Sequence, residues 1–271
     1  MADMEKNQFE EGIIAKLYSP KDDNNIKKDE RVFYTRRNAM YIDTMRSYIQ
    51  SVPLQYQKYF LAPLMAQASI HANTSGVFKG FHKNKETGLG QFGGSNKDAL
   101  FRIKGNIVLP FPIFSNFSCY YTVYNGDSNQ IVKEVPEVDL AYLDPPYNQH
   151  PYGSNYFMLN LILENKYPEN ISNVSGIPNN WNRSAYNKKQ YAYSVLSDMV
   201  KNIKAKYVLI SFNSEGFISL DEMKSMLKEN GNVQILETSY NTFRGCRNLT
   251  NLAEKGNRDI HVTEYLYLLE K

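Results

Sequence analysis

The spacing of apolar and polar positions predicts helices in the first part of the chain and hairpins after them. A helical repeat begins after Thr35, a suitable N-cap, and runs through Ile49. A second helix is expected over about 54–72, with Pro63 kinking or breaking it. From residue 76 to residue 106, short apolar pieces alternate with Gly, Asn and Lys, which is typical of hairpins.

The second half has the pattern of a mixed α/β domain. The apolar run 138–143 predicts a buried strand, and 207–212 predicts a second strand of parallel type. Helices are expected over about 156–164 and 188–204.

A third helix and two closing strands complete the pattern. Ser219 and Glu222 form a capping box that should open a helix ending near Gly231. Two final strands are expected over 233–240 and 263–269, joined by a basic loop.

The first thirty residues are polar and predict a solvated tail or linker.

The 271 residues are 42% hydrophobic, enough for one or two domains, and the net charge of +3 permits contact with nucleic acid without demanding it. Two cysteines and no His/Cys cluster predict a metal-free protein of the reducing cytoplasm. An apolar leader or membrane-length run is not found, so secretion and membrane insertion are not expected.

The most informative residues follow the run 138–143: Asp144, Pro145, Pro146 and Tyr147. Asp144 is a charged hydrogen-bond acceptor, and the two prolines offer only carbonyls at fixed backbone angles. Tyr147 can stack on a flat ring. Ligands of open α/β sheets lie beyond the carboxyl ends of the strands, so this loop predicts a site for a purine-like amine. The alternative is a Pro-Pro turn in which Asp144 caps the next segment.

The longer run from Tyr142 to Tyr156, YLDPPYNQHPYGSNY, closely resembles the catalytic motif of D12-class adenine-specific DNA N6-methyltransferases, the group that includes the Dam methylases. Stretches beginning at Asn73, Ile210 and Thr263 resemble further parts of the same family, so the resemblance extends from about residue 31 to the C-terminus. It implies S-adenosylmethionine as methyl donor and a flipped adenine in double-stranded DNA as substrate.

The resemblance also implies roles for residues around the motif. Asn148, Tyr152, Tyr156 and Asp127 are expected to contact the substrate base. Two alternatives stay open: Asp127 could serve only an Asn-Gly-Asp turn, and the two tyrosines could be core residues.

Basic residues in the hairpin region and the later loops are candidate DNA contacts, with an ordinary solvated surface as the alternative. The predicted set is Lys79, Lys83, Lys85, Arg102, Arg183 and Arg244.

One departure from the family concerns the methyl donor. Its members carry a strand ending in Phe-x-Gly-x-Gly, which this sequence does not contain. The pattern Gly88-x-Gly90-x-x-Gly93 has no apolar strand before it and is interpreted as a hairpin loop. We therefore expect a Rossmann-like methyltransferase sheet that is incomplete at the N-terminus, with the donor-binding part either encoded in a second polypeptide or lost.

The sequence thus predicts a three-layer α/β domain with an inserted helical and β-hairpin target-recognition region. The predicted segments are a tail (1–30), a helical segment (31–75), the recognition region (76–123) and the catalytic domain (124–271). The predicted function is site-specific DNA adenine N6-methylation in a restriction-modification system. The alternatives are a non-catalytic DNA-binding subunit or remnant, and a methyltransferase of RNA or a protein amide, many of which have Asn before Pro-Pro-Tyr.

Overall fold

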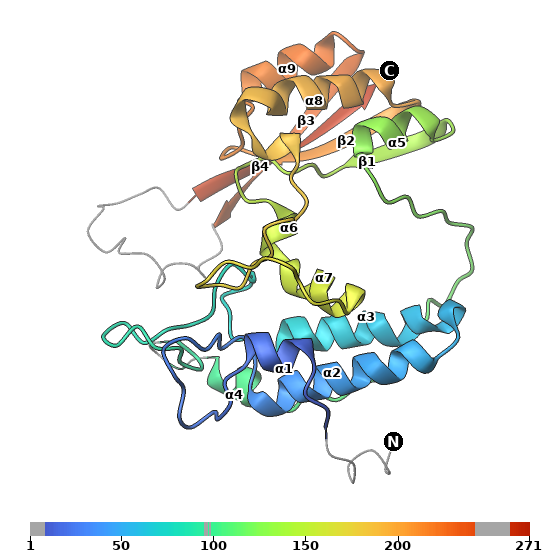
Figure 1. Ribbon diagram of the computed structural model, residues 1–271. Coiled ribbons are helices and arrows are strands. Elements are labelled where there is room, and N and C mark those ends of the chain that lie inside the picture. The colour runs from blue at the N-terminus through green and yellow to red at the C-terminus, as the bar shows by residue number, and fades with distance from the viewer. Residues whose placement is uncertain (1–8, 95–96, 98, 242–260) are drawn as a thin grey trace. The chain divides into compact units, whose positions relative to one another are not determined.

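The chain divides into two compact units, and each is described by itself (Figure 1). The computed structural model describes residues 9–94, 97, 99–241 and 261–271. Unit 1 comprises residues 1–117 and 152–182, and unit 2 comprises residues 118–151 and 183–271. Residues 152–182 therefore pack with the N-terminal part of the chain, so the compact units do not coincide with the segments expected from the sequence.

Unit 1 is helical. Its helices are α1 (Ile13–Tyr18), α2 (Arg36–Ser51), α3 (Leu54–Ile70), α4 (Leu100–Lys104), α6 (Tyr152–Asn155) and α7 (Phe157–Glu164). Thr35 caps α2 as predicted, because its side chain accepts a hydrogen bond from the Asn38 backbone N–H. A kink or a break was predicted at Pro63, and the break is wrong, since α3 continues through this residue.

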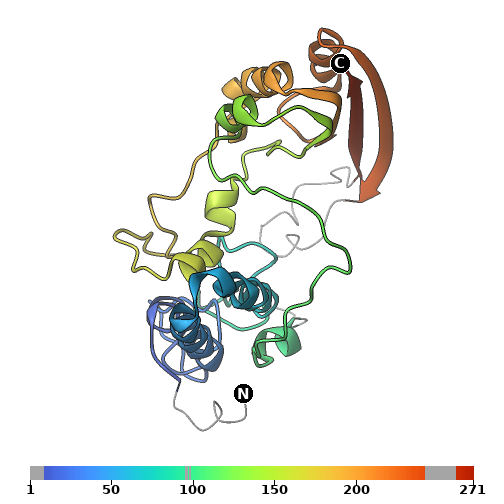
Figure 2. The same ribbon diagram turned by 90° about the vertical axis from the view of Figure 1, so that its right-hand side faces the viewer.

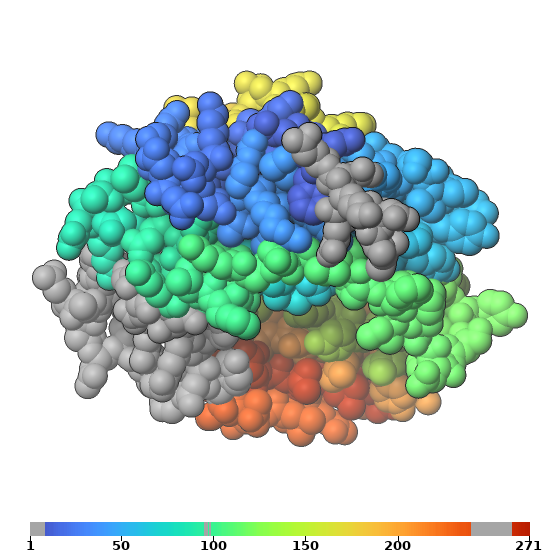
Figure 3. All heavy atoms as spheres, turned by 90° about the horizontal axis from the view of Figure 1, so that it is seen from below, coloured from blue at the N-terminus to red at the C-terminus, as the bar shows by residue number. Residues whose placement is uncertain are grey.

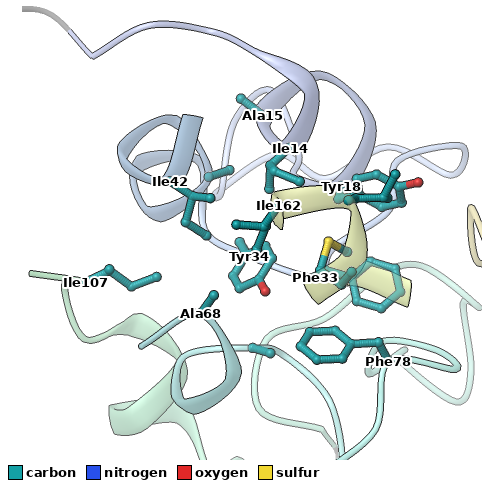
Figure 4. Close-up of a cluster of buried hydrophobic side chains, with 14 of the residues drawn as sticks. Ile14, Ala15, Tyr18, Phe33, Tyr34, Ile42, Ala68, Phe78, Ile107 and Ile162 are labelled. Carbon is teal, nitrogen blue, oxygen red and sulfur yellow. The ribbon is translucent and has the colours of Figure 1, made fainter. Parts of the chain in front are cut away.

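Aromatic and aliphatic side chains from helices and connecting segments form the core of unit 1 (Figure 4). The Phe33 ring lies at its centre, 5.8 Å from the Tyr18 ring and 5.9 Å from the Phe157 ring, in edge-to-face geometry. Ile14, Ala15 and Tyr18 of α1 are buried in this core. Residues 13–18 are therefore not part of a solvated tail, and that prediction is wrong for them.

A carboxylate distant in the sequence holds the start of α1. Asp43 of α2 accepts hydrogen bonds from the backbone N–H groups of Gly12, Ile14 and Ala15, at 3.0, 3.0 and 2.8 Å. The first turn of a helix leaves its N–H groups without backbone partners, and a carboxylate satisfies them and interacts favourably with the helix dipole. A helix of only six residues is stable here because α2 supplies this cap and the core covers its apolar face.

The glycine-containing segment of unit 1 is a hairpin, as predicted. Lys83 and Gly90 form an antiparallel bridge, and the Asn84 N–H donates to the Leu89 carbonyl at 2.8 Å. The fully buried Asn73 anchors the segment, because its amide donates to the Gln91 carbonyl and accepts from the Gly93 N–H. This hairpin belongs to no larger sheet among the described residues.

Unit 2 is a mixed α/β unit. Its elements are α5 (Ser128–Glu134), β1 (Val138–Leu143), the 3₁₀ turn η2 (Ala185–Asn187), α8 (Lys189–Asn202), β2 (Ala205–Asn213), α9 (Leu220–Lys228), β3 (Asn232–Asn241) and β4 (His261–Glu270). The strand order is β1-β2-β4-β3; β1 and β2 are parallel, and β4 is antiparallel to β2 and β3. The predicted capping box of α9 and the closing antiparallel pair are confirmed.

The helices of unit 2 cover one face of this sheet (Figures 1 and 2). Val208 and Ile210 of β2 and Leu269 of β4 point into a core that Leu196 of α8 and Met226 of α9 complete. Unit 2 taken by itself therefore has two layers, a sheet and one layer of helices, where the sequence predicted three.

The prediction that β1 is a buried strand is also wrong. β1 pairs only with β2 among the described strands, and its residues 138–140 and 142 are exposed. The apolar run predicted the strand correctly. The burial of a strand depends on neighbouring strands and helices, which the described part of unit 2 does not provide for β1.

The residues before α5 form a long exposed connection, green in Figure 3. Phe111, Ile113 and Phe117 are largely exposed, and so are Tyr120 and Val123. The hairpins expected for residues 76–123 do not extend into this stretch. Within the described residues, no helix is long and apolar enough to cross a membrane.

Candidate active site

The loop after β1 carries the candidate active site in unit 2. Asp144 is exposed, whereas Pro145, Pro146 and Tyr147 are half-buried. The Tyr147 carbonyl accepts a hydrogen bond of 2.8 Å from the Phe217 N–H, which attaches the loop to the segment after β2. Because the prolines have fixed φ angles and no N–H, they hold the loop in shape and leave the Asp144 carboxylate accessible.

The end of β2 orients the Tyr147 ring. Its centroid lies 5.9 Å from that of Phe212 at an interplanar angle of 68°, and its hydroxyl hydrogen-bonds with the Asn213 side chain. Asn213 is buried, and its Oδ1 also accepts from the Glu215 N–H at 3.1 Å. As predicted, residues 213–215 leave β2 at the same sheet edge as Asp144, because the two strands are parallel.

The charge around Tyr147 is negative. Burial raises the pKa of its phenol, and the carboxylates of Glu264, Asp144 and Glu215 raise that pKa further, against the opposing effect of Asn213. Tyr147 is therefore neutral at physiological pH, in a site with three acceptor-only carboxylates. Such a site suits a substrate that presents N–H donors or develops positive charge.

Asn148 stabilises the loop from within. Its Oδ1 accepts from the His150 N–H at 3.0 Å, and its carbonyl accepts from the Asn187 side chain at 2.7 Å. Its predicted contact with the substrate stays a prediction.

Asp127 has a capping role. It is the N-cap of α5, and its side chain accepts from the backbone N–H groups of Asn129 and Gln130. The turn-type alternative thus has a definite structural basis, and a substrate contact by Asp127 stays a prediction.

Tyr152 and Tyr156 belong to unit 1, so the structure does not assign them a position relative to Asp144. Their rings contact each other, with centroids 6.0 Å apart. Their predicted role as walls of a base pocket stays a prediction.

The structure places four of the six basic residues predicted to bind DNA at exposed positions. Lys79, Lys83 and Lys85 are exposed in unit 1, and Arg183 is exposed in unit 2. Arg244 lies outside the described residues.

The prediction that Arg102 contacts DNA is corrected by its hydrogen bonds within unit 1. Its guanidinium donates to the carbonyls of Ile70 and Ala72 and, at 3.5 Å, to that of Thr74, at the C-terminal end of α3 and just beyond it. Cations at such positions bind the last carbonyls of a helix. We therefore no longer expect Arg102 to contact phosphate.

Sequence reasoning missed two residues of the site. Glu264 approaches Tyr147 because it pairs with Asn213 across β2 and β4, a register that local pattern does not reveal. Asn187 lies 39 residues after Asn148, whose carbonyl it binds, and has no motif around it. For Glu264, the one signal in the sequence was the carboxylate itself, because its strand was predicted only as the closing strand of the sheet.

Comparisons with known proteins show the family of this chain. A model of the D12 class N6 adenine-specific DNA methyltransferases matches residues 4–226. The chain belongs to this family. The family resemblance stated from the catalytic motif is thereby confirmed, and the four-stranded mixed sheet is consistent with a methyltransferase fold.

Similar proteins include type II methyltransferases. M.CviAII of Paramecium bursaria Chlorella virus 1 is 29% identical over 263 residues, covering 95% of this chain and 70% of that protein. M.NlaIII of Neisseria lactamica is 28% identical over 251 residues, covering 89% and 68%. Modification methylase StsI of Streptococcus sanguinis is 27% identical over 257 residues, covering 90% and 35%. No solved structure gives a significant match.

D12 methyltransferases use S-adenosylmethionine, but the described residues do not fit a complete donor site. Gly88, Gly90 and Gly93 lie in the hairpin of unit 1, not between a strand and a helix. A Cβ on Gly90 would collide with the Val32 side chain, so this glycine allows close packing within the protein and not the approach of a ligand. The described residues therefore contain the loop at Asp144 but no glycine cradle for the donor.

Proposed function

We propose that this chain provides the catalytic loop and DNA-contacting surface of an adenine N6-specific DNA methyltransferase of a restriction-modification system. The donor-binding motif would come from a second polypeptide. The observation that carries the proposal is the exposed Asp144 carboxylate beside two half-buried prolines, at the carboxyl end of a strand parallel to β2. The names of the relatives, type II methyltransferases and modification methylases, support the restriction-modification setting.

The chemistry of the site fits an exocyclic amine. Adenine N6 is a weak nucleophile because its lone pair is delocalised, and acceptors at its two N–H groups favour the pyramidal form that reacts. Asp144 and the Pro145 carbonyl are the proposed acceptors, and Tyr147 is the proposed stacking ring. A methyl group that passed from the sulfonium of S-adenosylmethionine to N6, with its bond to sulfur breaking, would leave N6 positively charged until one proton went to solvent. The carboxylates of Asp144, Glu215 and Glu264 favour that charge.

The target base must leave the duplex to reach this loop. Flipping costs a few kcal/mol, which stacking and hydrogen bonds in the pocket offset. Lys79, Lys83 and Lys85 of unit 1 and Arg183 of unit 2 are the proposed phosphate contacts, which position the duplex without reading its sequence. Arg244 is a further proposed contact.

The test is to identify the methylated nucleoside. The chain is co-expressed with the product of a neighbouring reading frame that encodes Phe-x-Gly-x-Gly, in a host without adenine methylation, and the DNA is digested and analysed by mass spectrometry. N6-methyladenine should accumulate with the wild type and fall at least a hundredfold with Asp144→Ala. The control Asp221→Ala, an exposed carboxylate in the first turn of α9, should retain activity. Full activity of Asp144→Ala would refute the assigned role.

A non-catalytic DNA-binding subunit is the second candidate, because the described residues contain no glycine cradle for the donor. It predicts duplex binding that depends on the unit 1 lysines, with no methylated base in any combination of polypeptides. Methylation abolished by Asp144→Ala would exclude it.

A further inference from the structure

The loop after β1 is held by hydrogen bonds to two neighbouring carbonyls of its backbone. The Tyr147 carbonyl accepts from the Phe217 N–H at 2.8 Å, and the Asn148 carbonyl accepts from the Asn187 side chain at 2.7 Å. Asp144 itself is exposed, so packing does not fix its side chain. The place of its carboxylate therefore depends on the backbone of the loop and on the two groups that hold this backbone.

The two groups belong to different parts of unit 2. Phe217 ends a tight turn after β2, the strand that pairs with β1. This turn packs closely on the sheet, because a Cβ on Gly216 would collide with the Phe212 ring. Asn187 is the last residue of η2, which precedes α8 and lies outside the sheet. The loop is thus attached both to the sheet and to the start of a helix, and only the second attachment depends on a side chain.

η2 is itself anchored by the residue before Asn187. Tyr186 is buried, and its hydroxyl donates to Asn129 Oδ1 at 2.8 Å. The Asn129 amide donates in turn to the Asp198 carboxylate of α8 at 2.8 Å, and the Ser184 hydroxyl accepts from the Tyr186 N–H at 3.2 Å. Polar networks whose members are all paired are rigid. η2 therefore gives the Asn187 side chain a fixed point of attachment.

The same network reaches the start of α5. Asn129 is the second residue of α5, and Asp127 is the N-cap of this helix. Asp127 and Asp144 are the two aspartates predicted to lie at the substrate. Both are thereby connected to η2, Asp127 through Asn129 and Asp144 through the loop that Asn187 holds.

We propose that Asn187 is a positioning residue for methyl transfer: its amide holds the Asn148 carbonyl, and with it the loop that presents the Asp144 carboxylate to the substrate amine. Tyr186 supports this role by fixing η2. The inference rests on the proposed function and adds to it a residue that does not touch the substrate.

The expected effect of losing this contact is on the rate and not on DNA affinity. A displacement of about 1 Å at a reacting group can cost on the order of a hundredfold in rate. The proposed phosphate contacts lie elsewhere, so they should still bind the duplex. A fall in kcat with an unchanged KM for DNA is therefore the signature of a positioning role.

Two substitutions form a matched pair. Asn187→Asp keeps the shape of the side chain, removes its N–H donor and adds a negative charge. Asn230→Asp makes the same change at the end of α9, where the Asn230 amide donates to the Met226 carbonyl at 2.8 Å. Both asparagines are half-buried. Each variant loses one hydrogen bond to a backbone carbonyl, so a merely structural role of Asn187 would give the two variants similar properties.

Hydrogen exchange of the full chain, resolved by residue, tests the loop without any activity. The Phe217 amide is the reporter, because its acceptor is the Tyr147 carbonyl of the loop. The Gly216 amide is the internal control, because it donates to the Asn213 carbonyl within the turn. The Phe217 amide should exchange at least tenfold faster in Asn187→Asp, whereas Gly216 should change less than threefold.

The matched variant and the two amides define the outcomes of this exchange experiment. In Asn230→Asp, both amides should exchange within threefold of their wild-type rates. A Phe217 amide that exchanges alike in the wild type and in Asn187→Asp would overturn the inference, and so would equal acceleration in Asn230→Asp.

The kinetic experiment uses whichever preparation methylates DNA, the chain alone or the chain with a donor-binding polypeptide. Asn187→Asp should lower kcat at least tenfold and change KM for duplex DNA less than threefold. Asn187→Gln keeps a donor and should retain a kcat at least threefold above that of Asn187→Asp. Asn230→Asp should keep kcat within twofold of the wild type. A change confined to KM, or an equal fall of kcat in Asn230→Asp, would contradict a positioning role.

Failure of the proposed function gives a different result. A wild-type preparation that methylates no adenine in any combination of polypeptides would overturn the proposed function. The exchange rate of the Phe217 amide would still decide whether Asn187 holds the loop, because that measurement needs neither donor nor DNA.

Discussion

Asp43→Ala should destabilise unit 1, because Asp43 is the cap of a helix that is distant in the sequence. Its carboxylate accepts from three backbone N–H groups at 2.8–3.0 Å, and two of these belong to the buried residues Ile14 and Ala15. A buried donor that loses its acceptor costs about 1–3 kcal/mol, so two such losses lower the free energy of unfolding by about 3 kcal/mol. For a unit of this size the midpoint of thermal unfolding should fall by about 6–12 °C.

Urea unfolding followed by circular dichroism gives the change in stability, and hydrogen exchange locates it. Amides of residues 13–18 should lose protection first in Asp43→Ala. Asp43→Asn keeps one acceptor oxygen and should lose about half as much stability, roughly 1.5 kcal/mol. Asp29→Ala, an exposed carboxylate of the same unit, should change stability by less than about 0.5 kcal/mol. A loss in Asp43→Ala no larger than in Asp29→Ala would refute the capping account.

Three further predictions concern titration, helix capping and DNA contact. Burial raises the pKa of Tyr186 to about 12 from its ordinary value of 10.0, so stability present below pH 10 should fall by up to about 2.7 kcal/mol between pH 10 and 12. Tyr186→Phe should remove that part of the alkaline loss in denaturation curves measured across this pH range. Arg102→Ala should lower the free energy of unfolding by about 1–3 kcal/mol in urea titrations, while affinity for duplex DNA stays within about twofold. The double change Lys83→Glu with Lys85→Glu should reduce the salt dependence of DNA binding by roughly two ions in fluorescence titrations, and an unchanged salt slope would exclude both lysines as phosphate contacts.

Local signals in the sequence predicted the local structure correctly. Thr35 and the Ser219–Glu222 box mark helix starts because a cap depends on residues three positions apart. The prolines after β1 marked the end of a strand for a similarly local reason. Most helices and strands and the loop at Asp144 could therefore be predicted.

Features that depend on partners distant in the sequence could not be predicted. The pattern before residue 30 is polar and did not predict α1, because the cap of this helix comes from Asp43 on another helix. The apolar run of β1 predicted burial, but burial depends on neighbouring elements that local pattern does not reveal, and β1 pairs only with β2 among the described strands. Glu264 joins the site only through the register of β4 against β2.

The measurement that tests the account most directly is calorimetric titration of S-adenosylmethionine, first into the folded chain alone and then into its mixture with the polypeptide carrying Phe-x-Gly-x-Gly. The account predicts no heat of binding with the chain alone and micromolar binding with the mixture. Micromolar binding by the chain alone would contradict it, because these 271 residues would then contain a complete donor site.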